Sequence, residues 1–136
     1  MFEDGYNLEK LLEEFKDYKG IWLGWKPYNA NGHIKRPEGK IMENYTQVSP
    51  VHVDGGCYVD KKSFVNCNKN GNFSWTHHTC EGGVNVDFTT DRNSKPIWKK
   101  AWLNHYFTKS FEDYCDRVFN RGNMMNENRN FDHFFD

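Results

Sequence analysis

The chain lacks long apolar segments and an excess of charge of either sign. No run in its 136 residues approaches the roughly 20 apolar residues of a membrane-spanning helix. Its 18 Lys and Arg side chains nearly balance 19 Asp and Glu side chains, which leaves a formal net charge of −1. This balance argues against a dedicated nucleic-acid binder, because such proteins present a basic surface. Residues 1–5 also lack the charged and apolar regions of a signal peptide, so we predict a cytoplasmic protein.

Cysteine is scarce and forms no recognisable framework. Without a secretory signal, the 4 cysteines are expected to be free thiols. The alternative is a zinc site, because five possible ligands fall within residues 57–80: Cys57, Cys67, His77, His78 and Cys80. Only His77 and Cys80 have the paired spacing that structural zinc sites favour, so free thiols are the preferred interpretation.

A glycine-rich phosphate loop is also missing from the sequence.

Large rings carry much of the apolar content that is present. Aromatic residues make up 17% of the chain, with 11 Phe, 7 Tyr and 5 Trp. A chain of this length can build one domain with a core, but not two. We therefore predict a single domain over 1–122, followed by a polar and aromatic tail over 123–136. Ring-rich chains of this kind often present aromatic platforms for sugars or bases.

The first third of the sequence predicts a helix that leads into a strand. Residues 7–19 have apolar side chains at helical spacing, with Asn7 as the N-cap and Gly20 as the stop. Residues 21–25 are predicted to form a short buried strand. A loop is expected over 27–39 because it is rich in turn-forming residues. The segment 41–48 fits either a short helix or an extended piece.

Short strands dominate the prediction for the rest of the chain. Runs of β type occur at 57–59, 63–65 and 84–88, with turn-rich segments between them. Residues 97–107 are expected to form the last strand. Together with the helices, these runs predict an α/β fold, a mixed sheet of short strands with flanking helices.

A second helix is predicted after the last strand. Ser110 is expected to cap it, with Asp113 at the position of a capping-box acid. Gly122 is expected to end it. Its predicted buried stripe consists of Phe111, Tyr114, Cys115, Val118 and Phe119.

A histidine stands where the predicted last strand ends. His105 is followed by a hydroxyl-rich turn and then by the final helix. Ligands and metals often bind where a strand passes into a helix in α/β domains. A histidine at this point could bind a metal or give a proton to a leaving group, or it could simply pack at the strand end. The spacing alone leaves these interpretations open.

A polar loop follows the predicted strand at 21–25. It covers residues 28–33 and offers amide and imidazole groups, with carboxylates further on. Hydroxyl-rich ligands such as sugars are bound by planar polar groups beside an aromatic face, which Trp22, Trp25 or Tyr28 could supply. The equally acceptable alternative is a surface loop with a turn-forming Asn-Gly pair.

Three blocks together resemble the carboxy-terminal half of a group of bacterial glycosyltransferases related to families 2 and 92, which have the GT-A fold. The first is 25–45, where Tyr-Asn-Ala-Asn-Gly-His stands in place of an aromatic-Gly-Ser-Ser-Gly-His loop. The second is Lys-Ser-Phe-Val-Asn at 62–66, with a His-His pair downstream. The third and most specific is 104–122, which begins Asn-His-Tyr-Phe-Thr-Lys-Ser and ends in Arg-Gly.

This resemblance implies transfer of a sugar from a nucleotide-sugar donor to an acceptor hydroxyl, in cell-surface polysaccharide or glycan synthesis. A divalent metal, Mn²⁺ or Mg²⁺, would act as a Lewis acid on the departing diphosphate. His105 would complete the metal site or contact the diphosphate. Lys109 and the hydroxyls of Thr108 and Ser110 would contact phosphate oxygens.

The resemblance also implies an acceptor side. Asn31, Gly32 and His33 would face the sugar or the acceptor, and a carboxylate, Glu38 or Glu43, would be the catalytic base.

One motif of the family is missing from the chain. An Asp-x-Asp metal motif is found nowhere, and the upstream nucleotide-binding half of the domain is absent. We therefore expect an incomplete transferase domain that is inactive on its own. Its exposed edge is expected to favour self-association. The alternative is a non-catalytic carbohydrate-binding or interaction module that uses the same aromatic-rich surface.

Overall fold

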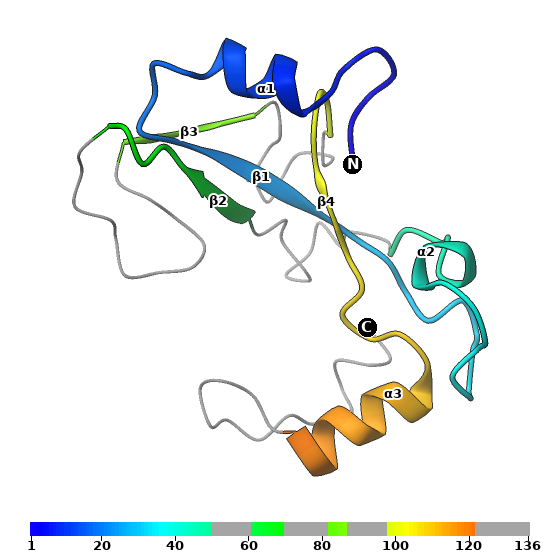
Figure 1. Cartoon of the computed structure of the whole chain (residues 1–136). Coiled ribbons are helices and arrows are strands. Elements are labelled where there is room, and N and C mark those ends of the chain that lie inside the picture. Colours follow the sequence, from blue (N-terminus) through cyan, green and yellow to red (C-terminus); the bar gives the residue numbers. More distant parts are fainter. Residues whose placement is uncertain (50–60, 70–81, 87–97, 122–136) are drawn as a thin grey trace, which may run out of the picture. The chain divides into compact units, whose positions relative to one another are not determined.

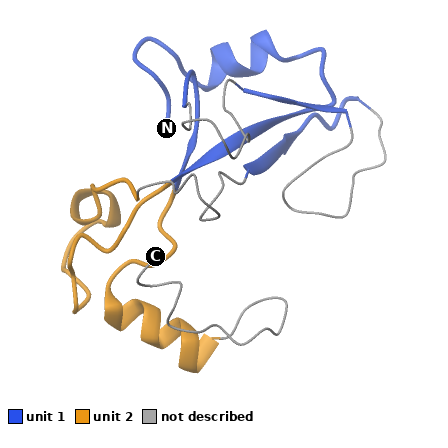
Figure 2. Ribbon diagram, turned by 180° about the vertical axis from the view of Figure 1, so that it is seen from behind, with its two compact units in different colours: residues 1–26, 51–104 blue, residues 27–50, 105–136 orange. Residues whose placement is uncertain are grey.

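The computed structural model describes residues 1–49, 61–69, 82–86 and 98–121 (Figure 1). The chain divides into two compact units, each built from two separate stretches of sequence (Figure 2). Unit 1 comprises residues 1–26 and 51–104, and unit 2 comprises 27–50 and 105–136. The prediction of one domain over 1–122 stays a prediction.

A small mixed sheet forms the centre of unit 1. Strand β1 (Gly20–Pro27) pairs antiparallel with β2 (Lys61–Val65) and parallel with β3 (Gly83–Asn85). Strand β4 (Leu103–His105) also pairs with β1, which gives four strands in all. The expected α/β class with a mixed sheet of short strands is confirmed at this level.

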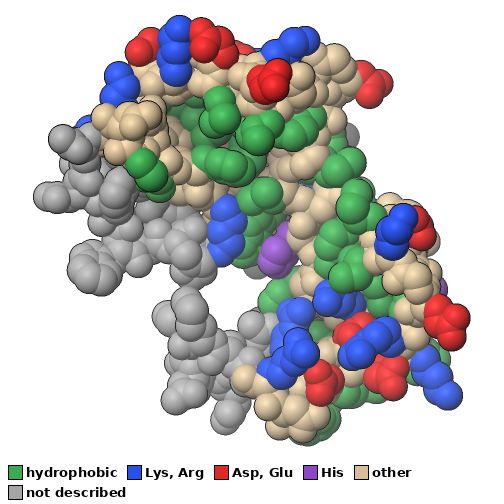
Figure 3. Space-filling view, in the orientation of Figure 1, with side chains coloured by type: hydrophobic (Ala, Val, Ile, Leu, Met, Phe, Trp, Pro, Cys, Tyr) green, Lys and Arg blue, Asp and Glu red, His purple; other side chains and the backbone are tan. Residues whose placement is uncertain are grey.

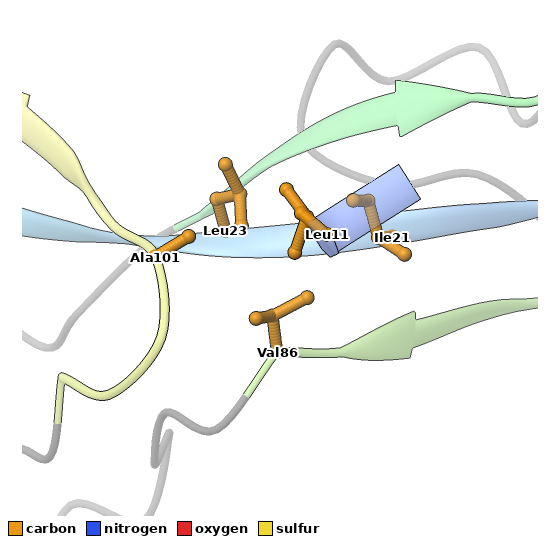
Figure 4. Close-up of a cluster of buried hydrophobic side chains, with 5 residues drawn as sticks. All are labelled: Leu11, Ile21, Leu23, Val86 and Ala101. Atoms are coloured by element: carbon orange, nitrogen blue, oxygen red, sulfur yellow. The ribbon is translucent and has the colours of Figure 1, made fainter. Parts of the chain in front are cut away.

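The core of unit 1 is formed by side chains from its helix, from its sheet and from the segment before β4 (Figure 4). Ile21 and Leu23 lie two residues apart on β1, so both project to the same face of the sheet. Leu11, from helix α1 (Leu8–Glu14), packs against them and is fully buried. Val86 and Ala101 complete the cluster. Burial of a Leu, Ile or Val side chain stabilises the folded state by about 1.5–3 kcal/mol.

Helix α1 begins as predicted but ends early. The Asn7 side chain accepts a hydrogen bond from the Lys10 amide at 2.9 Å, so the predicted cap is confirmed. The helix ends at Glu14 rather than at Gly20, because later carbonyl groups have partners elsewhere. Asn66 contacts three of them. Its side chain donates to the Lys16 carbonyl at 3.0 Å and to the Tyr18 carbonyl at 3.4 Å, and its backbone amide donates to the Lys19 carbonyl at 2.9 Å.

Unit 2 contains helix α2 (Ile41–Asn44), helix α3 (Phe111–Asp116) and a π-helical turn, η1 (Arg117–Arg121). The segment 41–48 was predicted to be either a short helix or an extended piece, and it contains one of each. Helix α2 comes first, and an isolated β-bridge between Val48 and Tyr28 follows it.

The C-terminal helix buries less of its predicted stripe than expected, since Phe111, Cys115 and Val118 are only half-buried. Tyr114 is fully buried as expected, but Phe119 is 70% exposed. A π-turn has more residues per turn than an α-helix, so η1 carries Phe119 away from the stripe that a 3.6-residue period would continue.

Other predictions have mixed outcomes. The strand expected at 63–65 is confirmed within β2, and the one expected from residue 84 begins at Gly83 in β3. The long last strand is reduced to the three residues of β4. The strand at 57–59, the stop at Gly122 and the tail lie outside the described residues. No helix in the described ranges is both long and apolar enough to cross a membrane.

Candidate functional site

The residues predicted to contact the sugar, the acceptor, the phosphates and the metal all belong to unit 2. The loop 27–49 carries the predicted sugar-facing and acidic residues, and 105–121 carries the predicted metal and phosphate residues. The two segments are joined by main-chain hydrogen bonds. The Tyr28 amide donates to the His105 carbonyl at 2.9 Å, and the Phe111 amide donates to the His33 carbonyl at 3.0 Å. The fold therefore brings the two predicted groups of residues into one body.

Asn31 closes the loop in which it lies. Its backbone is left-handed, with φ of 51°, and Gly32 follows with φ of 75°. The Asn31 amide group donates to the Asn44 carbonyl at 3.0 Å, and its side-chain oxygen accepts from the Gln47 amide at 2.9 Å. These bonds occupy both ends of the Asn31 side chain, so its evident role is to shape the loop.

His33 shares that shaping role. Its Nε2 lies 3.1 Å from the Asn44 carbonyl, and its ring meets the buried Tyr45 ring edge-on, with centroids 5.4 Å apart. The carbonyl of Asn44 is thus contacted by two of the three residues that the sequence placed toward the sugar. Helix α2 and the loop before it are held together at this point.

The carboxylate of Asp113 is the centre of a polar network. It accepts a hydrogen bond from Arg36 Nε at 2.7 Å and another from the Ser110 hydroxyl at 2.8 Å. The Tyr45 hydroxyl donates to it over a longer 3.4 Å. Burial acts to raise the pKa of Asp113, but the hydrogen bonds from Ser110 and Arg36 and the charges of Arg36 and Lys109 outweigh it. The pKa of the Asp113 carboxyl is therefore lowered below its ordinary value.

The cap of α3 is only half of the predicted capping box. Ser110 Oγ accepts from the Asp113 amide at 3.1 Å, as expected. The reciprocal bond is not made by Asp113, because the Ser110 amide donates to the Tyr45 hydroxyl at 3.1 Å instead. Tyr45 is almost completely buried, and that burial raises the pKa of its hydroxyl. The Asp113 carboxylate accepts from Arg36 and from the Ser110 hydroxyl instead of from the Ser110 amide.

A pocket of about 280 Å³ lies beside this network. Its lining consists of Arg36, Pro37, Gly39, Ile41, Asn44, Tyr45, Lys109, Asp113 and Arg121. Three of these side chains are cationic and one is a carboxylate. On the face drawn in Figure 3, Lys and Arg side chains of unit 2 are interspersed with Asp and Glu side chains.

Lys109 is the lining cation without an ion pair in the part of the chain that the structure describes. Arg36 pairs with Asp113, and Arg121 Nε lies 3.3 Å from an Asp116 carboxylate oxygen. Lys109 also has a left-handed backbone, with φ of 55°. Such a conformation costs a non-glycine residue about 1 kcal/mol or more and is common where function constrains the chain.

The two hydroxyls predicted to contact phosphate are both buried. Ser110 is fully buried and its hydroxyl serves Asp113. Thr108 Oγ1 is buried and makes no hydrogen bond to any described residue. An unpaired buried hydroxyl costs about 1–3 kcal/mol. Of the three residues predicted to contact phosphate, Lys109 is the one that lines the pocket, and its ammonium group has no ion pair among the described residues.

His105 and the nearby tyrosines form stacked pairs. The His105 ring stacks on Phe107 with centroids 6.0 Å apart, and Tyr28 stacks on Tyr106 with centroids 5.1 Å apart. Burial and then the neighbouring Tyr106 raise the pKa of Tyr28. Of the three rings proposed as an aromatic face, Tyr28 belongs to unit 2.

The other two proposed rings belong to unit 1 and are covered by lysines. Lys61 Nζ lies 3.9 Å from the centroid of the Trp22 ring, and Lys62 Nζ lies 5.3 Å from that of Trp25.

The two predicted acids are exposed residues of the loop. Glu43 lies in the first turn of α2 and pairs with Lys40 at 3.1 Å. The Glu38 carbonyl accepts a hydrogen bond from the Asn44 side chain at 2.8 Å.

A metal site can be considered only for the described ranges. Within them, no three His, Cys, Asp or Glu side chains are grouped so as to hold an ion. If His105 binds a metal, it does so without two further such side chains grouped around it in the described ranges. Of the zinc ligands considered from the sequence, Cys67 is an exposed free thiol, and the other four lie outside the described residues.

Sequence reasoning did not assign the side chains that line most of the pocket. Arg36, Asn44, Tyr45 and Arg121 stand within the blocks on which the resemblance rests, but no role was given to them. Asp113 was assigned to the helix cap alone. The single local signal was the Arg-Pro-Glu-Gly stretch at 36–39, whose cation precedes a turn.

No family model, curated protein or solved structure matches the chain.

Proposed function

We propose that the chain is part of a GT-A-type glycosyltransferase, which transfers a sugar from a nucleotide-sugar donor to an acceptor hydroxyl in glycan synthesis. The main support is the meeting of two resembling blocks, 25–45 and 104–122, around one polar pocket in unit 2. These blocks lie about sixty residues apart in the sequence, so their meeting does not follow from either block alone.

The lining of the pocket supports an anionic substrate. Lys109 has no ion pair among the described residues, and the lone lining carboxylate already accepts hydrogen bonds from Arg36 and Ser110. The phosphates of a nucleotide-sugar carry the charge that such a cation would bind. In this proposal, Lys109 contacts the donor phosphates.

The remaining roles follow the resemblance. His105 would supply one ligand to a divalent metal, and Glu38 or Glu43 would accept the proton of the acceptor hydroxyl. The loop shaped by Asn31, Gly32 and His33 would hold the acceptor side in place. A bound metal would act as a Lewis acid on the leaving diphosphate.

The test is a titration of the ¹⁵N-labelled chain with UDP-glucose, followed by NMR with and without Mn²⁺. The proposal expects shifts at Lys109 and paramagnetic broadening at His105 that requires the nucleotide. Lys109→Gln should weaken UDP-glucose binding about tenfold, the usual scale of one charge-assisted hydrogen bond. Lys35→Gln is the matched control, because Lys35 is an exposed neighbour that does not line the pocket.

Two results would count against the transferase. A folded sample in which millimolar UDP-glucose leaves unit 2 unchanged would contradict it. Shifts at Tyr28 and Tyr106 caused by free sugars but not by UDP-sugars would favour the carbohydrate-binding module, since those half-buried rings form a stacked aromatic pair in the same unit.

A further inference from the structure

The same pocket presents a second set of groups that a diphosphate would not use. Arg36 bonds to Asp113 through Nε, and its terminal Nη groups make no hydrogen bond to any described residue. A guanidinium held through Nε presents those two donors in a fixed direction. This arrangement suits the two oxygens of a carboxylate or phosphate group.

Asn44 lies in the same lining with its amide fixed. Its Nδ2 donates to the Glu38 carbonyl at 2.8 Å and to the Lys40 carbonyl at 3.0 Å. Both side-chain protons are therefore engaged, and the orientation of the amide is set. Its Oδ1 makes no hydrogen bond within the described ranges and can only accept. A hydroxyl group can donate to that oxygen, whereas a phosphate oxygen would be repelled by it.

Pro37 and Ile41 add apolar surface to the same lining. At about 280 Å³ the pocket is at the lower end of the size range of small-molecule sites. That volume is enough for one sugar ring beside Arg36 and Asn44, while a donor at Lys109 would place only its phosphates in the pocket. A sugar ring has C–H faces for the apolar surface and hydroxyls for Asn44.

The carboxylates around the pocket leave the two Nη groups available. Asp113 is engaged with Arg36 Nε, Glu112 accepts from the Arg36 amide at 2.8 Å, and Glu43 pairs with Lys40. A further oxyanion can therefore approach Arg36 without displacing any of these contacts.

We propose that the pocket binds an acidic sugar residue, with its oxyanion on Arg36 and a hydroxyl on Asn44. The proposal rests on the proposed transferase function in one respect, since it makes this sugar the acceptor. The oxyanion can be a carboxylate, as in a uronic acid, or the phosphate of a phosphorylated sugar. Asp113 is a positioning residue, because it acts through Arg36.

The test compares four probes on the full chain by NMR: glucuronate, glucose 6-phosphate, glucose and UDP-glucose. The expected result is a shift of the Arg36 Nε–Hε signal and of the Asn44 amides with glucuronate or glucose 6-phosphate, and affinity for glucose at least tenfold weaker. Preference between the first two probes identifies the source of the oxyanion. Binding should weaken as NaCl is raised.

Variants separate this site from the donor site. Arg36→Gln should weaken binding of the acidic sugar about tenfold or more while UDP-glucose affinity stays within about twofold. Lys109→Gln should do the reverse. Arg36→Lys keeps the positive charge but replaces the planar two-pronged donor by a single ammonium group. A loss of affinity in that variant, if it is folded, would show that binding requires the guanidinium fork and not the charge alone. Lys35→Gln should change neither affinity.

Each outcome decides a different point. Equal binding of glucose and glucuronate, or an Arg36→Gln variant that binds the acidic sugar normally, would overturn the acidic-sugar site. Equal losses of UDP-glucose affinity in the Arg36 and Lys109 variants would overturn it too, because Arg36 would then bind the donor together with Lys109. If UDP-glucose does not bind but glucuronate still binds at Arg36, the transferase fails and the acidic-sugar site stands.

Discussion

Replacing Asp113 should release helix α3 from the loop that it contacts. Asp113→Ala removes the acceptor of the Ser110 hydroxyl, and a hydrogen bond to a charged acceptor contributes about 1.5–3 kcal/mol. It also removes the partner of Arg36, whose side chain is 60% exposed, so that ion pair adds no more than about 1 kcal/mol. The expected total is about 2–4 kcal/mol.

Hydrogen exchange measures this cost locally in unit 2. The Glu112 amide donates to the Ile34 carbonyl at 2.9 Å, and the Tyr114 amide donates to the Ser110 carbonyl at 3.0 Å. Their protection should fall about 30- to 1,000-fold in Asp113→Ala, at 1.4 kcal/mol per factor of ten. Asp116→Ala is the control on the same helix, because within the described ranges Asp116 bonds to Asn120 and pairs with Arg121, both of which are exposed. Equal protection in the two variants would refute the reasoning.

The same carboxylate predicts how stability depends on pH. The pKa of Asp113 is lower in the folded chain than its ordinary value of about 3.9, so the unfolded chain binds the proton more readily. The stabilisation is therefore complete above about pH 4 and is lost as the pH falls through the lowered pKa. Protection of α3 should fall over that window in the native chain. In Asp113→Asn the fall should be absent, and an unchanged acid profile there would assign the effect to other groups.

Two further predictions concern the core and the strained turn. Leu11→Ala should destabilise unit 1 by about 2–5 kcal/mol. The measurement is urea unfolding followed by tryptophan fluorescence, since all the tryptophans lie in the ranges of unit 1. The control, Leu12→Ala at a side chain that is 50% exposed, should cost less than about 1 kcal/mol. Lys109→Gly should leave stability unchanged or raise it by about 1 kcal/mol, whereas Lys109→Val should lower it by about 1–2 kcal/mol, because a β-branched residue tolerates a φ of 55° poorly. Equal stabilities of the glycine and valine variants would show that the turn is not strained.

Local patterns in the sequence predicted the local structure correctly. Asn7 and Ser110 cap their helices because a short polar side chain reaches an amide two or three residues along the chain. The apolar residues of β1 predict a strand because side chains two residues apart on a strand point to the same face of the sheet. Interactions of this kind involve only a few consecutive residues, so they can be seen without the fold.

Where the helices end and how their last turns wind could not be predicted from the sequence pattern. Helix α1 ends early because Asn66, some fifty positions away, takes up the carbonyls of residues 16 and 19. Phe119 leaves the predicted stripe because the last turn is a π-turn. Neither effect has a signature in the period of the apolar residues.

The composition of the pocket was decided by tertiary structure in the same way. From the sequence alone, Asp113 is a helix-capping acid and Arg36 is a cation in a loop, and nothing in either segment indicates the other. The fold brings them within 2.7 Å although 77 positions separate them, and Tyr45 takes the Ser110 amide that the cap was expected to bind. The sequence by itself determined which residue types are available and which short segments form helices and strands. Only the tertiary structure decided which charges meet, because the free energy of an ion pair depends on separation in space and not on separation along the chain.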